Sequence, residues 1–183
     1  MKKGFTLVEV LAGIFIFVLV VGTATSLLVS AFSAQRRALA LREIIDSASY
    51  VIDYMARAIS MAKKMGIQIR EDSTICLGGS TGQNYIVGSQ NQSITFRTYK
   101  LNECQTFELE TGTRRIKEIR GGQTNYLTPE SLEVTNLKFF VQGDNPDDNL
   151  QPKVTIFLEI QKRGQPETKI SLQTTITQKD LDF

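Results

Sequence analysis

The feature that most restricts the fold is an uncharged run near the start of the chain. No side chain from Leu11 to Phe32 carries a charge. At a rise of 1.5 Å per residue this run spans about 33 Å as a helix, which is enough to cross the hydrocarbon core of a bilayer. It therefore predicts a membrane helix rather than the core helix of a soluble domain.

One acid lies beside this run. Glu9 stands two positions before Leu11, where insertion brings it into or near hydrocarbon. A charge at the bilayer centre costs about 2.5–3.5 kcal/mol on insertion scales, so Glu9 needs a partner. The candidates are backbone amides of the first turns and a free amine. Cleavage after Gly4 would create an ammonium group on Phe5, about one helical turn from Glu9, and would remove the two lysines that precede it.

The segment Lys3-Gly4-Phe5-Thr6-Leu7-Val8-Glu9 resembles the class III leader of type IV pilins and of the pseudopilins of type II secretion and competence systems. The resemblance implies that a membrane-embedded prepilin peptidase cuts after Gly4 and methylates the new N-terminal residue, Phe5. It also implies that Glu9 neutralises the N-terminus of a neighbouring subunit during fibre assembly.

Two other interpretations fit the same stretch. A secretory signal peptide would be cleaved at Ala31-Phe32-Ser33, but its apolar region is usually about 7–15 residues long and does not contain an acid. A plain signal anchor leaves Glu9 as an unexplained intramembrane acid. The N-terminal sequence of the mature protein distinguishes all three.

After the apolar run, the pattern predicts an amphipathic helix. Its apolar side chains recur at spacings of four and three, which places them on one face. They are Leu41, Ile45, Ala48, Ile52, Met55, Ile59 and Ala62. We expect one helix from near Phe5 to Met65, although a separate helix after a break near Ser33 gives the same stripe.

Beyond Gly66 the periodicity becomes that of β-strands. The clearest candidates are Ser93–Leu101, Leu132–Val141, Val154–Lys162 and Ile170–Thr177, and the weaker ones are Ile67–Ile69, Thr74–Leu77, Tyr85–Val87, Thr106–Leu109 and Arg115–Ile119. A helix followed by antiparallel strands is the α+β class. We expect a pilin-like fold in which the long helix packs on a β head, with a second small sheet. The predicted parts are a leader (1–4), a transmembrane assembly helix (5–33), an amphipathic helix (34–65) and a β-rich extracytoplasmic head (66–183).

The C-terminal third also resembles a family. Leu132-Glu133-Val134-Thr135-Asn136-Leu137, Gln151-Pro152-Lys153-Val154-Thr155-Ile156 and Ser171-Leu172-Gln173-Thr174-Thr175 are similar to the C-terminal region of minor pilins related to the J-type pseudopilin. This likeness, together with a large strand-rich head, favours a minor subunit.

The two cysteines, Cys76 and Cys104, are expected to form a disulfide, because a membrane-anchored chain with its bulk outside the cytoplasm is in an oxidising compartment. Closing a loop of roughly 30 residues would stabilise the head by about 3.5 kcal/mol. Two free buried thiols are the alternative.

Nothing in the sequence predicts an enzyme or a cofactor. Histidine is absent, which removes the commonest general base and a common metal ligand. Ser73 lies in a polar turn without an activating partner, and neither a phosphate-binding loop nor a paired-cysteine zinc motif is present.

An acidic loop is a weak calcium candidate through Asp144, Asp147 and Asp148. It lacks the alternating acids, central glycine and distal glutamate of a dedicated calcium loop. An ordinary exposed turn uses the same residue types and is the preferred interpretation.

A short basic run contains Arg114, Arg115, Lys117 and Arg120. Such residues could contact phosphates, but they also protect solvated edge strands, and no interleaved aromatic residues support stacking on bases. We favour the solvated edge strand, so nucleic acid is not expected as a partner.

The two resemblances together imply a minor pilin or pseudopilin precursor. The expected partners are other pilin subunits, prepilin peptidase, an inner-membrane assembly platform and membrane lipid. The flanking charges Lys2, Lys3, Arg36, Arg37 and Arg42 leave the orientation undecided, and the leader and the cysteines favour a single-pass inner-membrane protein with its head outside. The alternatives are the major subunit of the same fibre and a membrane-anchored adhesin or binding module.

Overall fold

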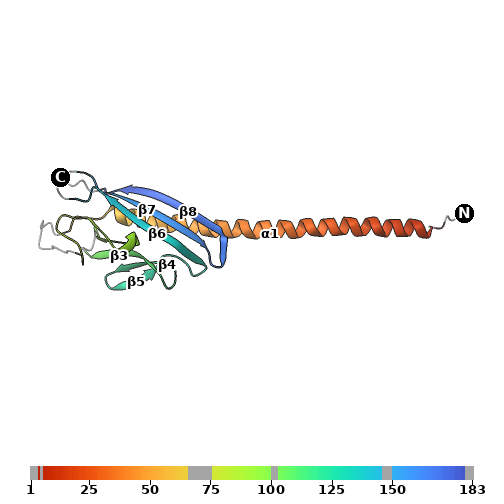
Figure 1. The fold of residues 1–183 in the computed structure, drawn as a ribbon, viewed down its shortest axis with the longest axis horizontal. Coiled ribbons are helices and arrows are strands. Elements are labelled where there is room, and N and C mark those ends of the chain that lie inside the picture. The colour runs from red at the N-terminus through yellow and green to blue at the C-terminus, as the bar shows by residue number, and fades with distance from the viewer. Residues whose placement is uncertain (1–3, 5, 66–75, 100–102, 146–149, 180–183) are drawn as a thin grey trace. The chain divides into compact units, whose positions relative to one another are not determined.

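The computed structural model describes residues 4, 6–65, 76–99, 103–145 and 150–179. The chain forms two compact units, residues 1–41 and 42–183. The helix α1 (Leu7–Ser60) begins in the first unit and continues into the second, where it is the first element (Figure 1). The strands are β1 (Tyr85–Val87), β2 (Ser93–Arg97), β3 (Cys104–Glu110), β4 (Arg115–Arg120), β5 (Gln123–Tyr126), β6 (Leu132–Gln142), β7 (Lys153–Lys162) and β8 (Gln165–Thr177), and a short 3-10 helix, η1 (Ser89–Asn91), precedes β2.

The strands form two antiparallel sheets, which confirms the predicted α+β class with a second sheet. The larger sheet has the order β1-β2-β3-β4-β5 and the smaller one has the order β6-β7-β8. Figure 1 shows the strands of the smaller sheet side by side along the C-terminal part of α1. The helix therefore lies within the head as the element on which the strands pack.

Several predicted strand bounds were wrong. The strand predicted for Ser93–Leu101 ends at Arg97, and the end of the candidate Thr74–Leu77 is a turn at Leu77. The candidate Ile67–Ile69 lies outside the described residues. The sequence analysis missed β5, which follows β4 through Gly121 and Gly122 at φ of +56° and +78°. Two adjacent residues at positive φ form the tight hairpin turn that glycine pairs favour.

The helix α1 ends at Ser60, before the predicted Met65. Beyond Ser60 the chain joins the sheet: the Lys63 amide donates to the Arg97 carbonyl (3.1 Å), and the Met65 amide donates to the Gln83 carbonyl (2.8 Å). The carbonyl of Ser60 accepts the amide of Lys179 at 2.8 Å. Hydrogen bonds to distant segments thus replace the last turn that the apolar spacing predicted.

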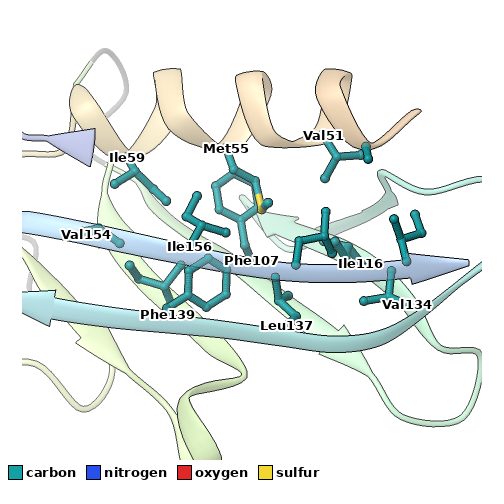
Figure 2. Packing of buried hydrophobic residues seen from close by; sticks show 14 of the residues in the cluster. Val51, Met55, Ile59, Phe107, Ile116, Val134, Leu137, Phe139, Val154 and Ile156 are labelled. Atoms are coloured by element: carbon teal, nitrogen blue, oxygen red, sulfur yellow. The ribbon is translucent and has the colours of Figure 1, made fainter. Parts of the chain in front are cut away.

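The core lies between α1 and both sheets. Figure 2 shows Val51, Met55 and Ile59 of α1 pointing at the strands below them. The buried side chains opposite the helix are Tyr85, Ile94, Phe96, Phe107 and Ile116 of the larger sheet and Leu132, Val134, Leu137, Phe139, Val154, Ile156, Leu158 and Ile160 of the smaller sheet. One apolar stripe on α1 therefore holds both sheets in a common core.

At the N-terminal end of the buried stripe, the residues that are buried differ from those that the sequence predicted. Ile44 and Val51 are fully buried, whereas Ile45 is 51% exposed and Ile52 is only partly buried. Adjacent residues on a helix differ by about 100° in direction, so a stripe can be shifted to one side without changing its spacing. The prediction for Ala48, Met55 and Ile59 is confirmed, since all three are buried on α1; Ala62 is also buried, but it lies beyond the end of the helix.

A β-bulge shifts the face of β6 that is buried. Leu132 and Val134 are buried, and the pattern then resumes one residue later at Leu137 and Phe139. The register of β6 on β7 shifts between Val134 and Asn136. The extra residue of a bulge allows both halves of one strand to direct their apolar side chains into the core.

Candidate functional site

The start of α1 is closed by a reciprocal pair of side chains. The backbone amide and the hydroxyl of Thr6 both donate to Oε2 of Glu9, each at 3.0 Å. In return the amide of Glu9 donates to the Thr6 hydroxyl oxygen at 3.4 Å. This Thr-x-x-Glu arrangement is a capping box, which satisfies amides that have no partner within the helix.

The capping box gives Glu9 the backbone partner that the sequence analysis considered. Its carboxylate is nevertheless exposed to the surroundings of the helix, as is Gly4 on the other side of Thr6. Phe5 lies outside the described residues. The sequence analysis did not assign Thr6 a role, although the glutamate three positions after a threonine is the signal that identifies a capping box.

The apolar run of α1 is exposed in the described part of the chain. An 18-residue window of α1 has a mean hydropathy of 2.5 and is 0% buried, so the helix is long and apolar enough to cross a membrane. Two of its threonines form hydrogen bonds within the helix: the hydroxyl of Thr23 donates to the Leu19 carbonyl (3.1 Å) and that of Thr25 to the Val21 carbonyl (2.7 Å). Such internal hydrogen bonds are what a lipid environment requires.

Further apolar side chains of α1 remain uncovered beyond this run. Leu39 is 59% exposed, Ile45 51% and Tyr50 63%. Singly exposed apolar residues are ordinary, but these lie on the same helix as an uncovered apolar run. Exposed apolar side chains on α1 therefore continue beyond the uncharged run.

Cys76 and Cys104 form a disulfide, as the sequence predicted. Cys104 begins β3, and Cys76 is buried at the start of a turn in which the Gly79 amide donates to the Cys76 carbonyl (2.9 Å). The bridge attaches this turn to the larger sheet. It is a structural element of the head rather than a reactive thiol pair.

The calcium candidate Asp144 has another role in the fold. Its two carboxylate oxygens accept the backbone amides of Asn84 (2.8 Å) and Tyr85 (3.2 Å) at the start of β1. Asp147 and Asp148 lie outside the described residues, so calcium binding stays a prediction. Within the described ranges no group of three or more acidic, histidine or cysteine side chains could hold a metal ion.

The basic run lies on and beside β4, and β4 is not an edge strand as predicted, because β3 and β5 pair with its two sides. Each cation faces an acid on a neighbouring segment. The pairs are Arg114–Glu133 (3.8 Å), Arg115–Glu130 (3.4 Å), Lys117–Glu108 (2.7 Å) and Arg120–Glu103 (3.6 Å). Much of the charge that could contact phosphates is thus neutralised within the head.

The buried acid Glu118 forms hydrogen bonds with side chains of the head. Glu118 is 5% exposed and accepts hydrogen bonds from the Tyr54 hydroxyl (2.9 Å) and from the Gln105 amide group. Burial and this carboxylate raise the pKa of Tyr54 to about 12. The tyrosine is therefore a neutral donor at physiological pH, and the arrangement joins α1 to the larger sheet.

Comparison with known protein families bears on the N-terminus. Residues 1–25 match the family described as the prokaryotic N-terminal methylation motif. The chain carries the N-terminal motif of type IV pilins and pseudopilins. Searches of curated proteins and of solved structures gave no match. The motif and the α+β fold together support a pilin-type precursor that is processed by prepilin peptidase, assembles with other pilin subunits and acts as a structural subunit rather than an enzyme.

Proposed function

We propose that this pilin-type chain is a minor subunit of a type IV pilus or of a secretion or competence pseudopilus. Prepilin peptidase cuts after Gly4 and methylates Phe5, and α1 then carries the subunit from the inner membrane into the fibre. The observation that carries the proposal is the methylation motif joined to a capped acid and an uncovered apolar helix.

Glu9 has two partners in succession in this mechanism. Before assembly the amide and hydroxyl of Thr6 hold its carboxylate at the start of α1. Cleavage exposes the ammonium group of Phe5, and in the fibre Glu9 pairs with this group of a neighbouring subunit. The pair favours the assembled state because each charge would otherwise stay unpaired in an apolar environment.

The uncovered side chains of α1 then pack on neighbouring helices. Ile45 and Leu39 are more than half exposed in the single chain. In the fibre these side chains and the apolar run contact the helices of neighbouring subunits. The head lies outside this interface and stays folded through its own core. The head is extracytoplasmic in this arrangement.

The test is to replace Glu9 by glutamine and by leucine in cells that make the fibre. We expect both variants to be cleaved after Gly4 and to stay in the membrane, because the Gly4-Phe5 junction and the apolar run are intact. Their amount in sheared fibres should fall by about tenfold or more, since one lost charge pair in an apolar site changes the equilibrium by at least that factor. Mass spectrometry of the mature N-terminus and quantification of fibre and membrane fractions measure both steps.

The matched control is Glu167→Gln, which removes an exposed acid from the head. It should enter fibres normally. Normal incorporation of both Glu9 variants would show that the acid has no role in assembly.

The assignment as a minor subunit rests on the likeness of the C-terminal third to J-type pseudopilins and on the strand-rich head. The number of copies in sheared fibres distinguishes a minor from a major subunit, because a major subunit would account for most of the fibre mass.

A further inference from the structure

Two arginines follow the apolar run of α1. Arg36 and Arg37 are both exposed, and Arg36 lies about 6 Å beyond Phe32 along the helix axis. A hydrocarbon core of about 30 Å is bordered on each side by a headgroup layer of about 5–7 Å. When the apolar run fills the core, both arginines are therefore level with the lipid headgroups.

The helix directs these two side chains back towards the membrane. In an α-helix the Cα–Cβ bonds tilt towards the N-terminus, which for Arg36 and Arg37 is the side of the apolar run. The long stem of an arginine can lie along apolar surface while its guanidinium group stays in the polar layer. Adjacent residues differ by about 100° in direction, so the two guanidinium groups reach headgroups on neighbouring sides of α1.

Neither arginine has an acidic residue beside it on the helix. Ion pairs along a helix form at spacings of three and four. The residues at these spacings from Arg36 and Arg37 are all uncharged, namely Phe32, Ser33, Ala34, Leu39, Ala40 and Leu41. Among the described residues, no carboxylate forms an ion pair with either arginine. Both charges are therefore available to a partner outside the chain.

The membrane orientation makes these two charges unusual. In the proposed function the head is extracytoplasmic, and cleavage after Gly4 removes Lys2 and Lys3. Arg36 and Arg37 are then the first basic side chains of the mature chain. They lie on the side of the membrane where basic residues next to a membrane helix are uncommon. A contact that compensates for this bias has to be made at the outer membrane surface.

We propose that Arg36 and Arg37 bind the phosphates of anionic phospholipids in the outer leaflet before the subunit enters the fibre. A guanidinium group offers a phosphate two parallel N–H donors, and its charge is attracted to the net negative charge of such a lipid. The contact holds α1 at a fixed depth, with its apolar run in the hydrocarbon core. This inference rests on the membrane orientation given in the proposed function.

The test is lipid binding by the purified full chain in an uncharged detergent. Native mass spectrometry during titration with phosphatidylglycerol gives the apparent Kd, and phosphatidylcholine, which has no net charge, gives the reference. We expect the wild type to prefer phosphatidylglycerol. Arg36→Gln or Arg37→Gln should raise the Kd for phosphatidylglycerol about fivefold, and the double variant about thirtyfold, as expected for basic residues at an anionic membrane surface.

The substitutions should leave the helix intact, because both positions are exposed and glutamine is a good helix former. Circular dichroism checks this. Arg36→Lys with Arg37→Lys keeps the charge and loses the paired donors of each guanidinium group. Its Kd should therefore lie between those of the wild type and of the double glutamine variant.

The matched control is Arg42→Gln with Arg57→Gln, which removes the same charge from two other exposed positions of α1. Each of these arginines has an aspartate at a spacing of four, Asp46 and Asp53 respectively, and both lie further from the apolar run. The control should keep the wild-type Kd. An equal loss of affinity in the control would overturn the proposal, because net charge alone would then attract the lipid.

Three other results would overturn it. The first is a wild type that binds both lipids equally, and the second is displacement of phosphatidylglycerol by inorganic phosphate, which would indicate a site for a soluble anion. The third is a double glutamine variant that binds phosphatidylglycerol like the wild type. If that variant were also lost from fibres, the arginines would instead pair with acids of a neighbouring subunit.

The measurement needs neither cleavage nor a fibre, so its outcome is separate from that of the Glu9 variants. Normal fibre entry of those variants would refute the assembly role of Glu9 and leave the lipid Kd unchanged. Loss of the lipid preference would refute the headgroup site and leave the result for Glu9 as it stands.

Discussion

Hydrogen bonds of individual side chains cap the start of α1 and join its later turns to the head. Thr6 and Glu9 close its start with three hydrogen bonds, and Tyr85 donates its hydroxyl to the carbonyl of Ile59 at 2.7 Å near its end. Between them Glu43 accepts from the Ser131 hydroxyl (2.7 Å) and from Lys162 (3.0 Å). These residues are far from Glu43 in the sequence, so only the folded head brings them together.

Glu43 makes the stability of the head depend slightly on pH. The Ser131 hydroxyl, and then Lys162, lower the pKa of this carboxyl below its ordinary value of 4.5. A carboxyl whose pKa is lower in the folded chain stabilises the fold at pH values above its pKa in the unfolded chain. This stabilisation is lost as the pH falls through its pKa in the folded chain. Glu43→Gln should therefore lower the free energy of unfolding by about 0.5 kcal/mol at pH 7, because the pair is partly exposed to solvent, and by less once the pH falls below the folded pKa of Glu43.

Thermal unfolding of both proteins across this pH range measures the effect. Asp53→Asn is the control, because it removes an exposed acid from the same helix. A difference between wild type and Glu43→Gln that stays constant from pH 7 to pH 3 would contradict the assignment.

The helix α1 presents two different apolar surfaces. Its buried stripe, which includes Met55, holds the two sheets together, while Ile45 lies beside this stripe and is half exposed. The sequence analysis placed both residues on one stripe. The structure assigns the first to the fold of the head and leaves the second for contacts outside it.

Two alanine substitutions test this division. Met55→Ala should lower the free energy of unfolding by about 2–5 kcal/mol, because it leaves a cavity in a closed core. Ile45→Ala should lower it by no more than about 0.5 kcal/mol, since the side chain is largely exposed. Urea unfolding of the two variants checks both values.

The same variants can be followed into fibres. Ile45→Ala should reduce incorporation while the head keeps its stability, if this face packs on neighbouring helices. Equal loss of stability in both variants would show that Ile45 belongs to the head core after all.

For the whole molecule, the disulfide is the covalent link between distant parts of the head. Cys76 and Cys104 are separated by 28 positions in the sequence. The double substitution Cys76→Ser with Cys104→Ser should lower the free energy of unfolding by about 3.5 kcal/mol, because the unfolded chain regains the entropy of the open loop. Chemical denaturation with and without a reducing agent provides the measurement.

The reducing agent should destabilise the wild-type protein to the same extent and leave the double variant unchanged. If reduction has no effect on the wild type, the bridge does not constrain the unfolded chain and the expected stabilisation is absent.

Much of the candidate site could be predicted because its signals are local. The uncharged run, the Gly4-Phe5 junction and Glu9 all lie within the first 32 residues of the sequence. Charged partners from distant strands could not be predicted in this way. The cations of β4 are one example, since their acidic partners lie on segments whose pairing follows from the sheet order.

The sequence by itself determined the membrane helix, the α+β class and the position of Glu9, because periodicity and charge act over neighbouring residues. The tertiary structure alone decided that Ile44 rather than Ile45 is buried, that α1 ends at Ser60 and that β6 contains a bulge. Each of these choices depends on what lies opposite the residue in the folded head. Helical or strand spacing fixes which side chains share a face, whereas the partners that cover that face come from distant parts of the chain.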